Sequence, residues 1–399
     1  MENFWNDAEA ANISTDLDMR VYTSRLLGKD TNLVMHGGGN TSVKSNVDGE
    51  DILYVKGSGW DLETIEPEGF APVKLNALLE MAKQPHLSDT DMVAQQRQAM
   101  INPEAPNPSV EAILHAIIPF KFVDHTHADA LVTISNTPDG KAILEKLYGN
   151  RVVFVPYVMP GFILAKAVYE QTKAIDWSNI EGMVLEHHGL FTFSDSAKTA
   201  YDKMIELAGL AENYLYEKTQ LPNPLPSEGV TESYLSQLTT AIAQIKCPDA
   251  PETILAMINP FSTAKAFAQR DEAVLKQASV LTPDHIIRTK QKPLILSGDP
   301  ELIDRELDAY VTAYQHYFDQ YQTGETCLNP APNYAIIQGE GSLAFGQTEK
   351  EVSIIQDINI HTFEAIMRAQ DLGGYAPLSD AELFEMEYWE LEQAKLKKA

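Results

Sequence analysis

Cysteine is almost absent from this sequence. Only Cys247 and Cys327 occur among the 399 residues, and neither belongs to a C-x-x-C pair. A disulfide framework and a zinc knuckle are therefore both unsupported. Basic residues are also scarce, since 30 lysines and arginines stand against 57 aspartates and glutamates, which leaves a net charge of −27. Such an acidic surface repels nucleic-acid phosphates, so we expect no nucleic-acid partner.

Long apolar runs are lacking as well. No uninterrupted apolar stretch approaches the ~20 residues that cross a bilayer, so we expect no membrane partner. The acidic residues 1–7 lack the apolar region of a signal peptide, and a cytoplasmic location is the default expectation. Hydrophobic residues make up 44% of the chain and charged residues 22%, which is the balance of a globular protein with a sizeable core.

The clearest boundary in the chain is rich in proline. Three prolines fall between residues 221 and 229, which predicts a linker over residues 219–230. We therefore expect a catalytic domain over residues 1–218 and a smaller accessory domain over residues 231–399. The second domain is expected to be α/β or mostly helical, with a structural or oligomerising role.

Apolar strand-like runs alternate with amphipathic helical patterns, which indicates an α/β fold of the layered α+β kind. The strands expected before the linker are residues 32–35, 41–44, 52–56, 122–125, 152–155 and 183–193, the last broken by a turn. The helices expected there are residues 16–28, 73–83, 109–118, 161–174 and 196–218. After the linker we expect strands at 293–296 and 334–338 and helices at 299–322, 347–371 and 379–397.

Three histidines have the spacing of a metal site. His125 and His127 stand two apart on an expected strand, so both side chains point to the same face. His188 ends another apolar strand, and Gly189 after it permits a tight turn. Three neutral imidazoles with an open position make a catalytic site for a divalent metal, with Zn²⁺ the first choice and Mn²⁺ or Co²⁺ also accepted. For the first pair alone, ordinary structural histidines are an equally good interpretation.

A carboxylate precedes these histidines. Glu111 lies near the start of the helix expected to begin with Ser109 as its N-cap, and that helix leads into the strand of His125. Beside a metal-polarised carbonyl, such a carboxylate transfers a proton to or from the neighbouring carbon. The alternative is an acidic residue that only complements the helix dipole. His115, four residues later, could hydrogen-bond Glu111, and we expect it to be a half-buried structural histidine.

Two glycine-rich turns precede the carboxylate. Residues 36–42 and residues 56–59 are rich in backbone N–H groups, and the N-cap at Ser109 offers a third set of donors. Turns and helix starts of this kind bind anions without a large charge. Each of these segments alone is more often a structural turn. Their occurrence together, upstream of the three candidate metal-binding histidines, is what favours anion binding.

These motifs together resemble the class II aldolase/adducin family. Within that family, the residues of these motifs are most similar to those in the aldolase portion of the bifunctional rhamnulose-1-phosphate aldolase/alcohol dehydrogenases. The motifs, in family order, are HGGGNTSVK at 36–44, KGSG at 56–59, PSVE at 108–111, HTH at 125–127, Pro156-Tyr157 with Gly161, and HHG at 187–189. The resemblance implies a class II aldolase-like domain with a central mixed or antiparallel sheet flanked by helices.

The resemblance also implies roles for single residues. It makes His125, His127 and His188 the metal ligands, and Glu111 and Tyr157 the proton-transferring residues. Those that would bind the phosphate are Asn40, Ser58, Gly59 and Ser109. The implied assembly is a homo-oligomer, a tetramer by analogy, with Tyr157 acting from a neighbouring subunit. One departure is Val110, where many sugar aldolases carry a second serine.

The expected activity is that of a lyase in carbohydrate metabolism. A ketose 1-phosphate similar to rhamnulose 1-phosphate would be cleaved reversibly to dihydroxyacetone phosphate and an aldehyde through a metal-stabilised enediolate. Two alternatives stay open from the sequence. One is a sugar-phosphate epimerase or decarboxylase on the same metal scaffold, and the other is a non-catalytic, adducin-like binding module.

Overall fold

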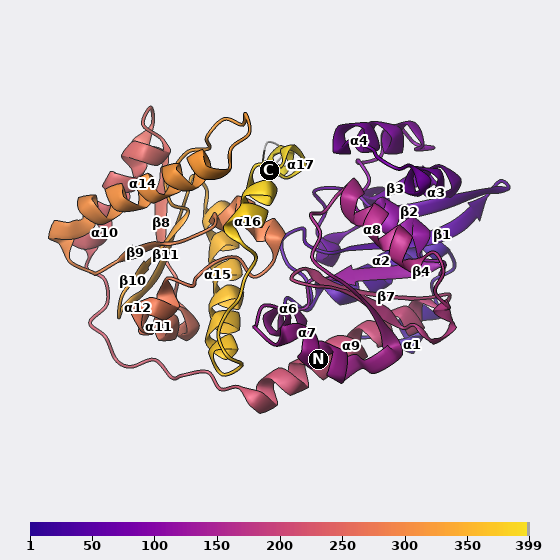
Figure 1. Cartoon of the computed structure of the whole chain (residues 1–399), viewed down its shortest axis with the longest axis horizontal. Coiled ribbons are helices and arrows are strands. Elements are labelled where there is room, and N and C mark those ends of the chain that lie inside the picture. Colours follow the sequence, from indigo (N-terminus) through magenta and orange to yellow (C-terminus); the bar gives the residue numbers. More distant parts are fainter. Residues whose placement is uncertain (397–399) are drawn as a thin grey trace. The chain divides into compact units, whose positions relative to one another are not determined.

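The computed structural model describes residues 1–396, with side chains to residue 394. The chain forms two compact units, and each has its own sheet (Figure 1). The first unit comprises residues 1–135 and 140–217. The second comprises residues 136–139 and the described chain from residue 218 onward. Within the described residues, no helix is both long and apolar enough to cross a membrane.

The first unit is built on a seven-stranded mixed sheet. The strand order is β3-β2-β1-β4-β7-β6-β5, and every neighbouring pair is antiparallel except β5 and β6. This is the central mixed sheet that the sequence predicts. The strands are β1 Asn40–Val47, β2 Glu50–Lys56, β3 Phe70–Lys74, β4 Phe122–Thr126, β5 Val152–Val155, β6 Gly182–Leu185 and β7 Gly189–Ser194.

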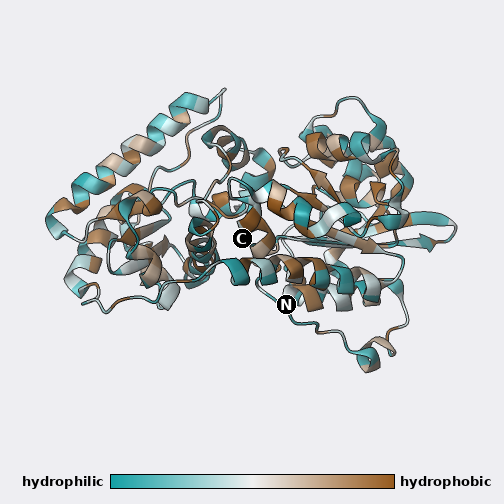
Figure 2. Ribbon diagram, turned by 60° about the horizontal axis from the view of Figure 1, so that its bottom comes forward, coloured by the Kyte–Doolittle hydropathy of each residue, from teal (hydrophilic) through white to brown (hydrophobic). Residues whose placement is uncertain are grey.

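Helices cover both faces of this sheet. They are α1 Asp7–Ala10, α2 Asp16–Gly28, α3 Leu75–Lys83, α4 Asp89–Gln98, α5 Ala112–Ile117, α6 Asp129–Ser135, α7 Gly140–Tyr148, α8 Phe162–Thr172 and α9 Ala197–Lys218. Helices α3 and α8 lie on one side of the sheet and α9 on the other (Figure 1). The ribbons of the helices alternate between hydrophilic and hydrophobic residues along their length, as amphipathic helices do (Figure 2).

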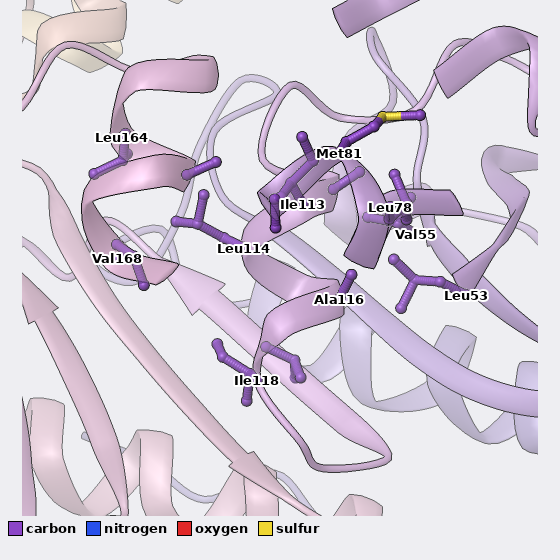
Figure 3. Close-up of a cluster of buried hydrophobic side chains, with 14 of the residues drawn as sticks. Leu53, Val55, Leu78, Met81, Ile113, Leu114, Ala116, Ile118, Leu164 and Val168 are labelled. Carbon is purple, nitrogen blue, oxygen red and sulfur yellow. The ribbon is translucent and has the colours of Figure 1, made fainter. Parts of the chain in front are cut away.

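The short helix α5 is the centre of the first hydrophobic core. Its Ile113 and Leu114 are fully buried among side chains of β2, α3 and α8 (Figure 3). Burial of one such side chain stabilises the fold by about 1.5–3 kcal/mol. Since Glu111 directly precedes α5, this packing also fixes the position of the carboxylate.

Three predictions of local structure were wrong in the first unit. Residues 32–35 form a turn rather than a strand. Residues 70–74 form β3, an edge strand paired with β2, where the sequence predicts only the start of a helix at residue 73. Pro72 hid this strand, because proline is tolerated only at such edges. The helix expected at 109–118 begins at Ala112, because residues 109–111 form a turn in which the Ala112 N–H donates to the Ser109 carbonyl, and Glu111 is the N-cap with a non-helical ψ of 10°. The helices α4, α6 and α7 were not predicted.

The second unit holds a four-stranded sheet in the order β8-β11-β10-β9, with β9 and β10 parallel. Its strands are β8 Leu255–Ile258, β9 Leu294–Leu296, β10 Tyr334–Ile337 and β11 Gly341–Gly346, of which β8 and β11 were not predicted. Its helices are α10 Glu232–Lys246, α11 Ser262–Ala268, α12 Glu272–Leu275, α13 Ile286–Thr289, α14 Ile303–Tyr321, α15 Glu349–Gln370, α16 Asp380–Glu387 and α17 Glu390–Leu396. The single helix predicted over 379–397 is therefore two helices, and residue 397 lies outside the described residues.

Candidate metal centre

Three imidazole rings converge at one end of the β4–β7 pair. His125 is on β4, His127 follows the end of that strand, and His188 lies in the turn between β6 and β7. Their candidate ligand nitrogens all lie within 4.8 Å of one another, and all three residues are buried. The ring centroids are 5.0–5.1 Å apart. The three histidines that the sequence singles out therefore form one cluster.

Strand pairing and one glycine bring the third histidine to the other two. β4 pairs with β7 in a register that places His125 opposite Phe191. A Cβ atom at Gly189 would lie 2.3 Å from the Thr126 carbonyl oxygen and 3.0 Å from Cε1 of His125. Only glycine lets the turn approach β4 so closely. His187 has a φ of 59°, in the left-handed region, which lets the chain reverse just before His188.

The hydrogen bonds of His125 orient a lone pair toward the cluster. Its Nδ1 lies 3.2 Å from the Leu190 carbonyl oxygen, which can only accept, so Nδ1 carries the proton. The lone pair is then on Nε2, which faces His127 Nε2 at 3.2 Å. Phe191 stacks on the ring with centroids 4.1 Å apart. A bond from the far ring nitrogen to a backbone carbonyl is the usual support of a metal-binding histidine.

Glu111 adds a carboxylate to the same cluster. Its Oε2 lies 3.5 Å from His125 Nε2, and its Oε1 lies 3.8 Å from His188 Nε2. The residue is buried, and within the described chain Oε1 accepts no hydrogen bond. A buried carboxylate oxygen without a donor needs a cation or a proton nearby. Together with the imidazole nitrogens, this donor set fits a divalent metal ion.

Two further side chains hold Glu111 in place. Asn40 Nδ2 donates to Glu111 Oε2 at 2.6 Å, and Asn40 Oδ1 lies 2.5 Å from Nε2 of His115. Since that amide oxygen can only accept, Nε2 of His115 carries the proton, and its Nδ1 accepts from the Ser42 hydroxyl at 2.8 Å. Burial lowers the pKa of His115 well below its usual value, so the ring is neutral. These contacts form a chain from Ser42 through His115 and Asn40 to the carboxylate.

The sequence did not predict this chain of hydrogen bonds. His115 is fully buried rather than half-buried, and it bonds Asn40 and Ser42 instead of Glu111. The signal that could have revealed it is the spacing of Asn40 and Ser42, which stand two apart on β1 and so share a face. Asn40, predicted as a phosphate ligand, uses both polar atoms of its amide within the chain.

Two of the three predicted anion-binding segments, residues 56–59 and the segment at Ser109, lie side by side. An isolated bridge joins Gly57 to Pro108, and the backbone N–H of Ser58 donates to the Asn107 carbonyl at 2.9 Å. The Ser109 N–H donates to the Lys56 carbonyl at 3.0 Å. Both amides are therefore already satisfied. The hydroxyl oxygen of Ser109 accepts from the Glu111 backbone N–H at 3.3 Å.

Gly59 and Tyr157 complete the set of predicted site residues. Gly59 follows Ser58 with a φ of 89°, and open space surrounds the position where a Cβ would be. Tyr157 lies between β5 and α8, and its ring centroid is 6.5 Å from that of His187, the neighbour of the metal-ligand candidate His188.

Comparisons with known proteins agree with this architecture. The model of the class II aldolase and adducin N-terminal domain matches residues 19–215, and the model of the second domain of class II aldolases matches residues 230–396. The chain therefore belongs to the class II aldolase family. Enzymes of this class depend on a metal ion, and the histidine cluster offers a site for one.

One curated relative covers almost the whole chain. It is the protein of Bacillus subtilis (strain 168) named "Uncharacterized oxidoreductase YuxG", which is 30% identical over 426 residues. The match covers 99% of this chain and 60% of the relative, so the chain spans about three-fifths of the length of that protein.

Two of the solved structures that the chain resembles cover about half of it. The N-terminal class II aldolase domain of a conserved protein from Thermoplasma acidophilum is 43% identical, with a TM-score of 0.49. That match covers 54% of this chain and 99% of the other. A sugar-phosphate aldolase from Thermotoga maritima is 16% identical, covers 49% of this chain and 91% of its own, and gives a TM-score of 0.38.

Proposed function

We propose that this protein is a metal-dependent aldolase that reversibly cleaves a ketose 1-phosphate similar to rhamnulose 1-phosphate. The products would be dihydroxyacetone phosphate and an aldehyde. The observation that carries the proposal is the convergence of three imidazole nitrogens and one carboxylate in a single buried cluster. Membership of the class II aldolase family supports it.

The metal site in this proposal consists of His125, His127 and His188. Zn²⁺ is the first choice because it is commonly held by three neutral imidazoles with one position left for substrate, and Mn²⁺ or Co²⁺ are accepted by similar donors. When bound, the ion supplies Lewis-acid stabilisation of the negative charge that develops on the substrate oxygens as the bond between C3 and C4 breaks.

The chain's own residues would move the protons. In the cleavage direction, the phenolate form of Tyr157 or a hydroxide ion would accept the proton of the C4 hydroxyl, the C3–C4 bond would break, and the aldehyde would depart. Glu111, when protonated, returns a proton to C3, which completes dihydroxyacetone phosphate. The hydroxyls of Ser58 and Ser109 and the backbone N–H of Gly59 hold the phosphate, while Asn40 keeps Glu111 directed at the reacting carbon.

The quaternary structure belongs to the same proposal. If Tyr157 serves the site of a neighbouring subunit, the active form is a homo-oligomer, and a tetramer is the form implied by the family resemblance. The small-molecule partner is a sugar phosphate.

Two rival functions give different measurements. An epimerase or decarboxylase on this scaffold needs the same metal and base, but it releases no dihydroxyacetone phosphate. An adducin-like binding module needs neither metal nor Glu111. The three candidate metal ligands and Glu111 are all present in the cluster, which favours an enzyme over the module.

The test is to purify the protein without chelator, measure its metal content, and follow the cleavage of rhamnulose 1-phosphate by coupled detection of dihydroxyacetone phosphate. The double variant His125→Ala/His127→Ala is compared with His86→Ala, which removes an exposed imidazole of the same unit. We expect about one metal ion per chain and product release in the wild type and in His86→Ala, and neither in the double variant. If the wild type binds metal but releases no product from any ketose 1-phosphate, an epimerase or decarboxylase is favoured. If the wild type binds no metal, both the aldolase and these rival enzymes are excluded.

A further inference from the structure

The second unit contains a cavity that the proposed aldolase chemistry does not use. Its volume is about 230 Å³, and its walls come from the ends of α10 and α13, from the loop before β10, and from α15 and α16. Sites for drug-sized ligands usually enclose about 300–1,000 Å³. A cavity of this size therefore suits a small metabolite.

Three cationic side chains line this cavity. Lys246 donates from Nζ to the side-chain oxygen of Asn333, and Lys290 donates from Nζ to the carbonyl of Asn329. The backbone carbonyl of Arg288 accepts from Asn333 Nδ2, but its guanidinium makes no hydrogen bond or ion pair with the described part of the chain. None of the three cations lies within 4.0 Å of a carboxylate oxygen of residues 1–394. Three cations against two more distant carboxylates, Glu351 and Glu387, leave an excess of positive charge, which is unusual in a chain that carries a net charge of −27.

Burial destabilises the charged forms of the cavity lysines when no ligand is bound. Lys290 is only 7% exposed, and burial lowers its pKa to about 8, while burial also lowers the pKa of Lys246. The ammonium group of Lys290 lies 3.7 Å from the ring centroid of Tyr314, a cation–π contact that offsets part of the desolvation. Glu387 and Glu351 act on these lysines only from beyond 4.0 Å, and an anion in the cavity would supply a counter-charge at ion-pair distance.

The backbone of Lys290 is also strained. Its φ of 63° and ψ of 176° lie in a region that is otherwise occupied almost only by glycine. Such a conformation costs about 1–3 kcal/mol, and strain of this kind concentrates at binding sites and ligand clamps. The strained residue is the same one whose buried ammonium group lines the cavity, so two independent observations meet at Lys290.

Two carboxylates line the cavity at a greater distance from the cations. Glu387 is buried, its Oε1 accepts from the Tyr314 hydroxyl at 2.8 Å, and burial raises its pKa to about 7. Glu351 Oε2 accepts from the Gln347 backbone N–H at 2.8 Å. Because both keep acceptor capacity, they can accept hydrogen bonds from hydroxyl groups of a ligand.

We infer that this cavity binds a small hydroxylated metabolite through an anionic oxygen group, either a phosphate or a carboxylate. Arg288, Lys246 and Lys290 hold the anionic oxygens, and Glu387 and Glu351 accept from the ligand's hydroxyls. The second unit is then a ligand-binding domain with its own site, distinct from the histidine cluster of the first unit.

The experiment is calorimetric titration of the full chain with two probes, glycerol 3-phosphate and glycerate, which share hydroxyls and differ in the anionic group. The informative variant is Arg288→Gln, because within the described residues that side chain makes no hydrogen bond or ion pair whose loss would destabilise the unit. Its matched control is Arg305→Gln, an exposed arginine of α14 outside the cavity. All titrations are repeated in the His125→Ala/His127→Ala background, which removes binding through a metal ion at the first unit.

We expect at least one probe to bind, with an affinity at least about tenfold weaker in Arg288→Gln and unchanged in Arg305→Gln. The probe that binds more tightly identifies phosphate or carboxylate as the recognised group. Equal affinity in the two arginine variants, or no binding of either probe to the wild type, would overturn the inference. If Arg288→Gln fails to fold, Lys246→Met against the exposed control Lys276→Met gives the same comparison.

Discussion

Single protons decide the properties of the candidate metal site. The Leu190 carbonyl fixes the proton of His125 on Nδ1, and the Asn40 carbonyl oxygen fixes that of His115 on Nε2. The first bond aims a lone pair at the cluster, and the second turns the amide of Asn40 so that its N–H, not its oxygen, faces Glu111. The chemistry of the cluster therefore depends on acceptors that are not themselves candidates for ligands.

The variant Glu111→Gln separates metal binding from proton transfer. Glutamine retains an oxygen that can accept from Asn40, so the fold and the three imidazoles should be preserved. We expect the metal content to stay near that of the wild type while kcat falls about 10²–10⁴-fold, the usual contribution of a general acid–base group. Metal analysis and steady-state kinetics on the same preparation check this, and a variant that keeps its kcat would exclude Glu111 as the acid–base residue.

His115 is a positioning residue in this scheme. In His115→Phe, the oxygen of Asn40 loses its donor, and the amide is free to turn its oxygen toward the Glu111 carboxylate. Loss of one hydrogen bond to a charged group costs about 1.5–3 kcal/mol. We therefore expect kcat to fall roughly tenfold or more, with little change in KM or in metal content.

The conservative variant His115→Gln is the control for this prediction. Its amide N–H can again donate to Asn40, so part of the lost kcat should return. If His115 had only a structural role, both His115→Phe and His115→Gln would lose thermal stability, and their kcat values would not differ in this way. The pH profile of kcat is measured alongside. It should differ from that of the wild type in His115→Phe, where Glu111 loses its hydrogen bond from Asn40, and stay close to it in His115→Gln.

Some residues of the site could be predicted from local sequence spacing, and others could not. His125 and His127 were predicted together because alternation along one strand is a local property. The chain from Ser42 to Glu111 was not, since it requires β1 and α5 to meet across about 70 residues of sequence. The same holds for the second unit, where Lys246 at the end of α10 meets Arg288 and Lys290 at the end of α13, more than 40 residues along the chain.

At the scale of helices and strands, the errors of the sequence-based prediction lie at turns and at the edge of the sheet. The helices α2 and α9 were predicted nearly to the residue. The edge strand β3 was missed because it contains Pro72, and α5 was predicted too long because Ser109 looks like a helix cap. In the structure, residues 109–111 form a turn, and Glu111 is the N-cap.

The turn between β6 and β7 gives a prediction at this scale. In Gly189→Ala the new Cβ would lie 2.3 Å from the Thr126 carbonyl, so β7 must shift away from β4. We expect destabilisation of about 1–3 kcal/mol, as for other overpacked sites, and a metal affinity at least tenfold lower because His188 moves with the turn. Metal titration of the stripped protein and thermal unfolding measure the two effects.

A second glycine provides the matched control. Gly209 lies within α9, and a Cβ there would meet only ordinary contacts at 3.5 Å or more. Gly209→Ala should therefore stabilise the fold by about 0.5–1 kcal/mol and leave metal binding unchanged. If both alanine variants lowered metal affinity alike, the close approach of Gly189 to β4 would not be the cause.

At the scale of the whole molecule, the excess of acidic residues and the buried Glu387 act on stability in the same direction. A chain with a net charge of −27 repels itself more strongly as pH rises through the titration of its carboxylates, so its stability should fall. Glu387 adds to this because burial raises its pKa to about 7 in the folded state, above its usual value near 4.5. Between about pH 4.5 and 7 the folded state binds more protons than the unfolded state, so raising the pH through this window lowers the free energy of unfolding.

Salt separates the two contributions. Self-repulsion between exposed charges is screened at 1 M salt, where the Debye length is about 3 Å, whereas the desolvation of a buried carboxyl is not. We expect the melting temperature of the wild type to fall from pH 5 to pH 8 at low salt, and to keep part of that fall at high salt. In Glu387→Gln, which cannot ionise, the residual fall at high salt should disappear from the transition of the second unit. The stability difference between the variant and the wild type should therefore grow, on the order of 2 kcal/mol, from pH 5 to pH 8. A slope that is the same in both proteins at high salt would show that Glu387 ionises without penalty, and the cavity beside it would then be open to water rather than reserved for a ligand.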